Sequence, residues 1–398
     1  MSVPNDLLFI AGLSLLLGYF VGKGTFTLRI TSIVGYIFTG ILLGPVLHIL
    51  KVPQAGADLV VNVTLSLIGF VIGGTFTLDY LRGAGKQIWV IILGESMGAF
   101  LLVLVGVYLL TRDLPLSLIL AALAPASAPA GTLAAIRDSR ASGPLTKATI
   151  AVVGLDDATS IILFVVSIAV VKVLLGGEMS VHELVLVPLK EILGSAVAGG
   201  AIGWGLSLAV KRTSERGNIL VLTLASLLLA GGLARVFHFS LILTSMFVGA
   251  TLVNLAPAES KISFQEIEGI LPPVYVAFFI LAGSELRPEL LLSMGLVGVV
   301  YIVARSIGLI SGASIGAWIS RAPEVIVKYL GFAILSQAGV AVGLSLLVAS
   351  ELSAFGPQGI QYGTIAVTII SATTVFFEIV GPIGVRFAVT RAGEFGRG

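Results

Sequence analysis

The chain alternates from end to end between long apolar runs and short polar segments. Most runs approach about 20 residues, the length at which a helix crosses the hydrocarbon layer of a membrane. The pattern predicts thirteen spanning helices at 6–22, 31–50, 58–78, 88–111, 114–136, 146–171, 192–211, 217–236, 239–256, 268–286, 290–319, 325–350 and 362–387, or twelve if the first or seventh is demoted. We therefore expect an all-α membrane protein.

Composition supports this fold class. Hydrophobic residues make up 57% of the 398 residues and charged residues 11%, whereas a soluble domain carries about 25% charged residues. The loops are short, so we expect one transmembrane domain over 1–398 and no soluble regulatory domain. The first run lacks the basic flank and cleavage site of a signal peptide, and we expect it to span the membrane. With no cysteine, disulfides and thiolate metal sites are excluded.

The lysines and arginines lie mostly on one side of the predicted membrane. Sixteen of the 23 fall in odd-numbered loops or at the C-terminal end, for example Arg140, Arg212 and Arg391. Loops rich in Lys and Arg stay in the cytoplasm. We therefore expect a multi-pass protein of the cell membrane, with the N-terminus outside and the C-terminus in the cytoplasm.

Helices 1 to 6 and 8 to 13 share weak sequence matches in the same order. The matched segments are Phe38-Thr39-Gly40 with Phe247-Val248-Gly249, 70–75 with 279–284, and Glu95-Ser96-Met97-Gly98 with Arg305-Ser306-Ile307-Gly308. An odd helix count with halves of opposite orientation is typical of transporters built from inverted repeats. We expect two inverted-topology repeats of six helices, joined by the helix at 192–211.

The fifth helix of each repeat is interrupted. Pro125, Pro129 and Gly131 weaken the first of these helices, and Gln337 and Gly339 lie at the corresponding place in the second. Backbone groups released inside a membrane must find partners in protein or in a water-filled cavity. Such breaks in matching segments of both halves indicate the substrate site of a transporter.

Five ionisable residues lie well inside the predicted spans: Glu95, Asp156, Asp157, Arg305 and Glu378. An acid at the bilayer centre costs about 2.5 to 3.5 kcal/mol on insertion scales, so these residues indicate function. They belong to the helices that flank the interrupted ones in each repeat. We therefore expect them to gather around one centre.

Asp156 and Asp157 are neighbours on a helix and point about 100° apart, so they cannot face the same partner. One can bind a transported cation while the other pairs elsewhere. Hydroxyl oxygens of Ser127 and Thr132, together with freed carbonyls, would complete a set of hard ligands for an alkali cation. Arg305 is the expected counter-charge. The remaining acids have open roles: Glu95 pairs with the arginine or lines a cytoplasmic funnel, and Glu378 is a structural residue or a ligand.

The chain resembles the cation:proton antiporters, the superfamily of sodium/proton and potassium/proton exchangers. The run 35–45 (GYIFTGILLGP) is similar to the second-helix signature of that family, and Asp156-Asp157 resembles the ion-binding motif of its paired-Asp branch. Arg305 falls where the family has a basic residue, and 336–340 (SQAGV) resembles its second unwound helix.

This resemblance implies a homodimer that works by an elevator-type movement. The dimerisation part would be about 1–86 and 217–289, the linker about 192–211, and the moving core about 88–171 and 290–390. Two departures stand out. Ser127-Ala128-Pro129 lacks a polar ligand usual in the first break, and Arg305 replaces the lysine of electrogenic members. Paired aspartates favour two protons per cation, whereas Arg305 favours one, and we expect one.

The leading hypothesis is exchange of Na⁺, or of K⁺ or Li⁺, for H⁺ in pH homeostasis, with Asp157 as principal carrier and Asp156 paired to Arg305 or assisting. The protein would be no enzyme, would have no catalytic residue and no cofactor, and would bind no nucleic acid. Its partners would be the cation, the proton and the lipid bilayer. A sodium-coupled organic anion transporter is one alternative. An intramembrane aspartyl protease is another, although it needs two carboxylates on facing helices.

Overall fold

A computed structural model describes residues 7–27, 32–47, 50, 54–78, 85–176, 181–213, 215–284 and 295–397. The helices of the described residues are α1 (Leu7–Thr27), α2 (Ser32–Ile41), the π-helix η1 (Leu42–Val46), α3 (Gln54–Gly74), α5 (Gly85–Thr111), α6 (Leu114–Leu123), α7 (Pro129–Asp138), α8 (Pro144–Gly176), α9 (Val181–Val210), α10 (Arg216–Phe237), α11 (Leu241–Leu255), α12 (Pro257–Ser284), α14 (Gly295–Ile319), α15 (Glu324–Ala333), α16 (Gly339–Leu352), the 3₁₀ turn η2 (Ser353–Phe355) and α17 (Gly356–Arg391). No strand occurs among them.

The predicted all-α fold is confirmed. When α2 with η1, α6 with α7, and α15 with α16 each count as one crossing, the described residues form thirteen crossings. Some ends differ from the prediction: α9 begins at Val181 rather than at 192, and α12 begins at Pro257 rather than at 268. Hydropathy detects only the apolar part of a helix, whereas these helices continue through polar residues. The predicted start of the eleventh helix, at 290, lies outside the described residues.

Both predicted interruptions are present. The first break separates α6, which ends at Leu123, from α7, which begins at Pro129. The second break separates α15, which ends at Ala333, from α16, which begins at Gly339. Proline suits the first position of a helix, because the N–H that it lacks would have no helical acceptor there.

The described chain divides into two compact units. Unit 1 comprises 1–52, 84–176 and 279–398, and unit 2 comprises 53–83 and 177–278. Unit 1 contains both breaks and every predicted site residue. The predicted roles of dimerisation part, linker and moving core stay predictions.

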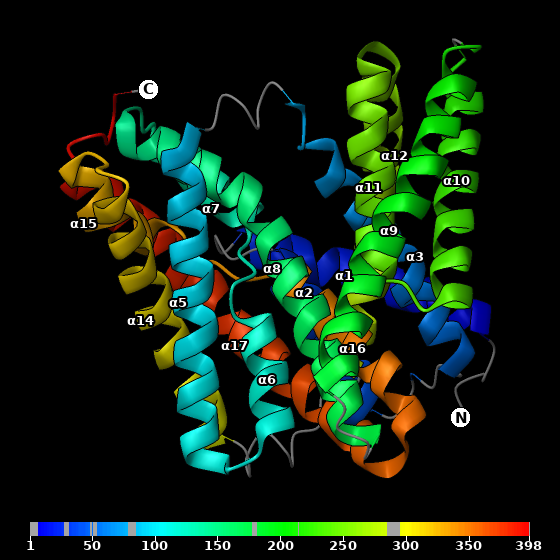
Figure 1. Cartoon of the computed structure of the whole chain (residues 1–398), viewed down its shortest axis with the longest axis horizontal. Helices are drawn as coiled ribbons and strands as arrows, with labels where there is room; N and C mark the ends of the chain where they lie inside the picture. Colours follow the sequence, from blue (N-terminus) through cyan, green and yellow to red (C-terminus); the bar gives the residue numbers. More distant parts are fainter. Residues whose placement is uncertain are drawn as a thin grey trace. The chain divides into compact units, whose positions relative to one another are not determined.

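Within unit 1, α5 and α14 lie side by side (Figure 1) and cross closely through glycines. A Cβ added to Gly98 would lie 2.4 Å from the carbonyl oxygen of Gly308, and one added to Gly312 would lie 2.9 Å from the Cα of Glu95. Side chains at these positions would push the two backbones apart. The close approach brings the helix of Glu95 against the helix of Arg305.

Unit 2 packs α11 against α3 and α9 (Figure 1) around a core that includes Phe70 and Val248. A Cβ on Gly249 of α11 would lie 2.2 Å from the carbonyl oxygen of Phe70. In unit 1, a Cβ on the matched Gly40 would lie 2.1 Å from the carbonyl oxygen of Ile280. Each matched glycine thus meets the matched segment of its own unit, which supports the predicted repeat.

The surface is typical of helices that face lipid. Large apolar side chains are exposed, with Trp318 and Val197 both 73% accessible, whereas Arg305, Glu95 and Asp156 are fully buried. Nine helical segments of the described residues are long and apolar enough to cross a membrane. In water this arrangement would be unfavourable, but in a bilayer the apolar side chains contact hydrocarbon.

Candidate functional site

The two breaks of unit 1 are held by the guanidinium group of Arg305. Its Nε donates to the carbonyl of Ala124 at 2.8 Å, and Nη2 donates to that of Ala126 at 3.1 Å, both in the first break. Nη1 donates to Leu335 at 2.8 Å, and Nη2 also reaches Ser336 at 3.4 Å, both in the second break. One fully buried cation therefore satisfies carbonyls that the interrupted helices release.

Further hydrogen bonds join the breaks directly. Gln337 Nε2 donates to the carbonyl of Leu123 at 3.0 Å and to the hydroxyl of Tyr301 at 2.9 Å. The backbone N–H of Ala128 donates to the carbonyl of Ser336 at 3.1 Å. The carbonyls of Leu123, Ala124, Ala126, Leu335 and Ser336 thus accept hydrogen bonds from protein. Side-chain oxygens remain as the principal ligands for an ion.

The paired acids lie in the middle of α8, the predicted sixth helix. Asp156 is fully buried and Asp157 is 5% exposed. Both carboxylate oxygens of Asp156 and Oδ1 of Asp157 have no hydrogen-bond partner among the described residues. A charged carboxylate in such a place is costly unless a proton or a cation compensates it. The unpartnered oxygens of the pair are therefore chemically suited to a proton or a cation.

The acids are close enough to Arg305 to feel its charge but do not take its hydrogen bonds. Arg305 interacts electrostatically with Glu95 and Asp156, and Glu95 with Asp157. In the described part of the chain no carboxylate oxygen lies within 4.0 Å of the guanidinium nitrogens. The aromatic ring of Phe377 stacks on the guanidinium, with 4.2 Å between Cζ and the ring centroid. That Arg305 acts as the counter-charge to the acids stays a prediction. It would do so by electrostatic attraction over a distance longer than that of an ion pair.

The two predicted hydroxyl ligands are buried without hydrogen-bond partners in the described residues. Ser127 lies in the first break beside Asp156, close enough to interact with its carboxylate, although the geometry of a good hydrogen bond is missing. Thr132 lies in α7, and its hydroxyl makes no hydrogen bond to the paired acids in the described chain. Of the two, Ser127 is the better placed to share a cation with the pair.

The two glutamates occupy different surroundings. Glu95 is fully buried and accepts a hydrogen bond of 2.8 Å from Ser96, so it does not line an exposed funnel. Glu378, on α17, is 3% exposed. Its Oε1 would lie 3.7 Å from a Cβ built on Gly131 in the first turn of α7. Glu378 therefore borders the first interrupted helix.

Comparison with known proteins identifies the family. The family described as "Sodium/hydrogen exchanger, transmembrane" matches residues 12–391, nearly the whole chain. The chain belongs to the sodium/hydrogen exchanger family. It is a multi-pass membrane protein of a family of transporters, which removes the protease alternative. The ligands of this family are transported ions rather than a cofactor.

Solved structures show the same fold. The chain is similar to the structure at pH 8 of the sodium proton antiporter MjNhaP1 from Methanocaldococcus jannaschii, with 17% identity and a TM-score of 0.75 over 96% of this chain and 98% of the other. A structure of the same antiporter from an electron-microscopy map matches with 18% identity and a TM-score of 0.69, covering 98% of this chain and 97% of the other. Among curated proteins no significant match is found.

One residue that positions the site of this exchanger-family chain was missed from the sequence. Glu394, just beyond α17, accepts hydrogen bonds from the backbone N–H groups of Leu145 and Thr146 at 2.7 and 2.8 Å. It also accepts one from the Thr146 hydroxyl at 2.7 Å. A carboxylate at a helix N-terminus stabilises that end, and here the helix is α8. No signal reveals this, because the partners are 248 and 249 residues apart.

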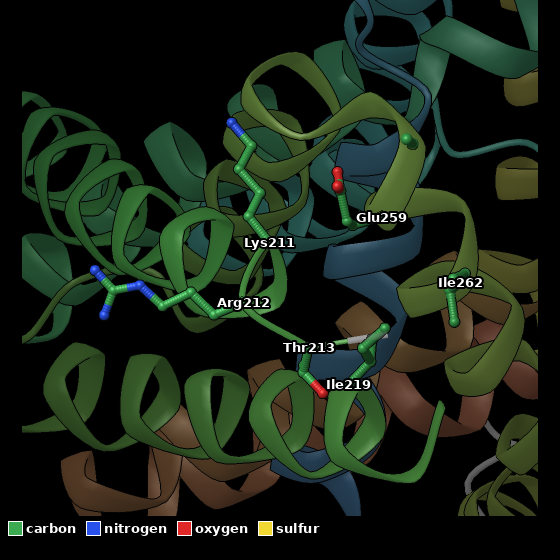
Figure 2. Close-up of a pocket in the computed structure, with 7 residues that line it drawn as sticks. Lys211, Arg212, Thr213, Ile219, Glu259 and Ile262 are labelled. Carbon is green, nitrogen blue, oxygen red and sulfur yellow. The ribbon is translucent and has the colours of Figure 1, made fainter. Parts of the chain in front are cut away.

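An open pocket of about 430 Å³ lies in unit 2. Its lining residues include Lys211, Arg212 and Thr213 after α9, and Glu259 and Ile262 in α12 (Figure 2). In Figure 2 the lysine and arginine side chains point in different directions rather than toward one common centre. None of the predicted site residues lines this pocket, so it is separate from the ion site.

Proposed function

We propose that this protein exchanges Na⁺, or another alkali cation, for H⁺ at the acid pair of α8. The observation that carries the proposal is the state of the pair: three of its four carboxylate oxygens are buried without a hydrogen-bond partner in the described chain. Such oxygens favour either a proton or a hard cation. A site that accepts either but not both couples the two flows in opposite directions.

The two acids have different roles in this proposal. Asp156 is the member that interacts electrostatically with Arg305, and Asp157 is the member with residual exposure, at 5%. We therefore assign Asp157 to the travelling ion and proton. Asp156 assists, together with the hydroxyl of Ser127. Thr132 is a weaker candidate ligand because, unlike the hydroxyl of Ser127, its own hydroxyl has no electrostatic interaction with the pair among the described residues.

Arg305 supports an exchange of one proton per cation. An arginine stays protonated in proteins, and all three nitrogens of this guanidinium donate to backbone carbonyls. It therefore cannot release a second proton during the cycle. Measuring flux with and without a clamped voltage tests this, because a one-for-one exchange carries no net charge.

The hydrogen bonds between the breaks also support an elevator-type movement. Arg305 and Gln337 tie α14 and both broken helices into one piece. The acids lie on α8, which packs against α6 and α15 of this piece, so the piece can carry them across the membrane as a unit. We propose that the protein is a homodimer in the cell membrane, with its C-terminus in the cytoplasm. The dimerisation part would stay fixed while the core moves.

The test is cation-driven proton movement in proteoliposomes with Na⁺, K⁺ and Li⁺ in turn. Asp157→Asn should abolish exchange, because the amide carries neither the charge for a cation nor the exchangeable proton. Glu268→Gln, at an exposed site on α12, is the matched control and should exchange normally. Normal exchange by Asp157→Asn would remove the assignment of the carrier.

A further inference from the structure

The last turns of α17 carry an open groove of about 370 Å³ on the surface of unit 1. Its lining residues are Ile383, Arg386, Phe387, Thr390 and Arg391. They follow one another at intervals of three and four residues, so they share one face of the helix. All five are exposed. The groove is therefore open to the medium that surrounds this end of the helix.

The floor of the groove is held in place by α15. The ring of Phe387 packs edge-on against Tyr329 and Phe332, with centroid distances of 6.4 and 5.3 Å. A Cβ added to Gly384 would lie 2.3 Å from the carbonyl oxygen of Phe332, so the backbones of α15 and α17 are in close contact. Phe387 is nevertheless 42% exposed. It therefore offers a fixed apolar surface to a ligand in the groove.

Two arginines flank the groove. Arg386 lies over the ring of Phe395 and Arg391 over that of Phe387, each with 5.7 Å between Cζ and the ring centroid. Such contacts use the flat face of a guanidinium and leave the N–H groups at its edge to donate. Among the described residues neither arginine side chain has an ion-pair or hydrogen-bond partner. None of the residues that line the groove is acidic. The groove therefore presents two positive charges that no neighbour neutralises.

An apolar stripe leads away from the arginines along α17. Phe376, Ile379, Ile383 and Phe387 follow at spacings of three and four residues and are 40 to 63% exposed. At 1.5 Å per residue the stripe is about 16 Å long, and it runs toward the middle of the helix. A free phosphate ion would contact the arginines alone, whereas a phospholipid would contact the arginines with its head group and the stripe with an acyl chain. The combination therefore favours a lipid.

The open pocket in unit 2 lacks this combination. There Lys211 and Arg212 point in different directions (Figure 2), and Glu259 lines the same pocket. An acid weakens the attraction for an anion, and cations that diverge cannot hold one phosphate together. On α17, by contrast, both arginines border a single groove. The groove on α17 is therefore the better site for an anionic head group.

We propose that this groove binds the phosphate group of an anionic phospholipid. Arg386 and Arg391 donate to the phosphate oxygens, as guanidinium groups do in charge-assisted hydrogen bonds. The hydroxyl of Thr390 lies between them, and an acyl chain follows the apolar stripe. The lipid belongs to the leaflet at the C-terminal end of α17. With the proposed orientation this is the cytoplasmic leaflet, which carries the negative lipid charge. The proposal does not depend on ion exchange, because the acid pair takes no part in it.

The test is lipid binding to purified, delipidated protein in detergent, counted by native mass spectrometry. Phosphatidylglycerol is added in one series and phosphatidylcholine with the same acyl chains in another. The first phosphatidylglycerol should bind about tenfold more tightly than the first phosphatidylcholine. Arg386→Gln and Arg391→Gln should each weaken phosphatidylglycerol binding about fivefold, the contribution of one arginine near an anionic membrane surface. Their phosphatidylcholine binding should change less than about twofold.

Two further variants separate this groove from general attraction to basic residues. Lys147→Gln removes another exposed cation from the same unit, next to Thr146, and should bind phosphatidylglycerol as the wild type does. Thr390→Trp keeps both arginines and fills the groove, so it should weaken phosphatidylglycerol binding about fivefold or more. Thr390 is exposed, so this variant should fold, and an unchanged melting temperature verifies it.

The outcomes decide both the site and its ligand. Equal affinity of the wild type for the two lipids would overturn the proposal. So would wild-type binding by both arginine variants, or an equal loss in Lys147→Gln, because any exposed cation would then act in the same way. Inorganic phosphate should displace the lipid only in large excess, since it lacks an acyl chain. Displacement at equal concentration would overturn the lipid and indicate a site for free phosphate.

Discussion

The two broken helices are interrupted by different residues. The first break, Ala124 to Ala128, contains Pro125 and is followed by Pro129 at the start of α7. The second break, 334–338, has no proline, and Ser336 and Gln337 supply its polar side chains. Proline prevents a helix from continuing, whereas glutamine only offers the backbone a partner. The first break therefore has a local cause in its prolines in addition to tertiary contacts, whereas the second depends on tertiary contacts alone.

The hydrogen bonds show the same asymmetry. The first break supplies acceptors, the carbonyls of Leu123, Ala124 and Ala126. The side-chain donors come from the second half of the chain, from Arg305 and Gln337. An interrupted helix is tolerated inside a membrane only if its freed groups find partners. Here the second half of the chain supplies the side-chain partners for the first, and in return the backbone N–H of Ala128 in the first break donates to the carbonyl of Ser336.

The strongest test of this comparison is Arg305→Met, which removes the donor shared by both breaks. Hydrogen bonds to a charged group contribute about 1.5 to 3 kcal/mol each, and four carbonyls lose theirs, so we expect destabilisation by more than about 3 kcal/mol. Thermal unfolding in detergent measures it. The melting temperature of Arg305→Lys should lie between those of the wild type and Arg305→Met, because an ammonium group cannot reach all four carbonyls. An unchanged melting temperature for Arg305→Met would show that the breaks do not need the arginine.

A smaller effect is expected from Gln337→Leu, which removes the one side chain of the second break that donates to the first. The carbonyl of Leu123 then loses this donor in a buried place, at a cost of about 1 to 3 kcal/mol. Gln358→Leu is the control, because Gln358 is exposed and its Nε2 donates to the hydroxyl of Tyr362, away from the breaks. Equal melting temperatures of the two variants would argue against a bond between the breaks.

The smallest effect is expected from Pro125→Ala. Proline stabilises a compatible site by about 0.4 to 1 kcal/mol through the unfolded chain, so its loss should cost no more than that. The first break should persist, because Arg305 still holds the carbonyls of Ala124 and Ala126. Amide hydrogen exchange across 121–130 measures it. Protection continuous from α6 into α7 would show that the proline, rather than the arginine, maintains the break.

Much of the fold could be predicted from hydropathy alone. A helix that crosses a bilayer must be apolar over its length, so thirteen crossings follow from thirteen apolar runs. The ends of α9 and α12 could not be placed, because polar residues beyond the bilayer form helix without any hydrophobic signal. The breaks were visible because proline and glycine at membrane depth disturb a helix wherever they occur.

The residues of the candidate site could be predicted from the sequence, but their contacts could not. Its acids and its arginine could be listed from the sequence, since each ionisable residue in an apolar run is costly and therefore conspicuous. Their partners could not. Arg305 meets carbonyls about 180 residues away, and Glu394 caps α8 across a comparable separation. Such contacts depend on how helices cross, and the close crossing of α5 and α14 at Gly98 and Gly308 is one cause.

By itself the sequence determined the membrane fold, the two interruptions and the residues that carry charge, because each of these follows from the cost of polar groups in hydrocarbon. Only the tertiary structure decided that Arg305 binds the broken helices rather than an acid. It also decided that three oxygens of the acid pair are buried without a hydrogen-bond partner in the described chain. The physical reason is that hydrogen bonds need short distances and favourable angles. In the folded chain, backbone carbonyls lie within that reach of the guanidinium, whereas the carboxylates lie farther away.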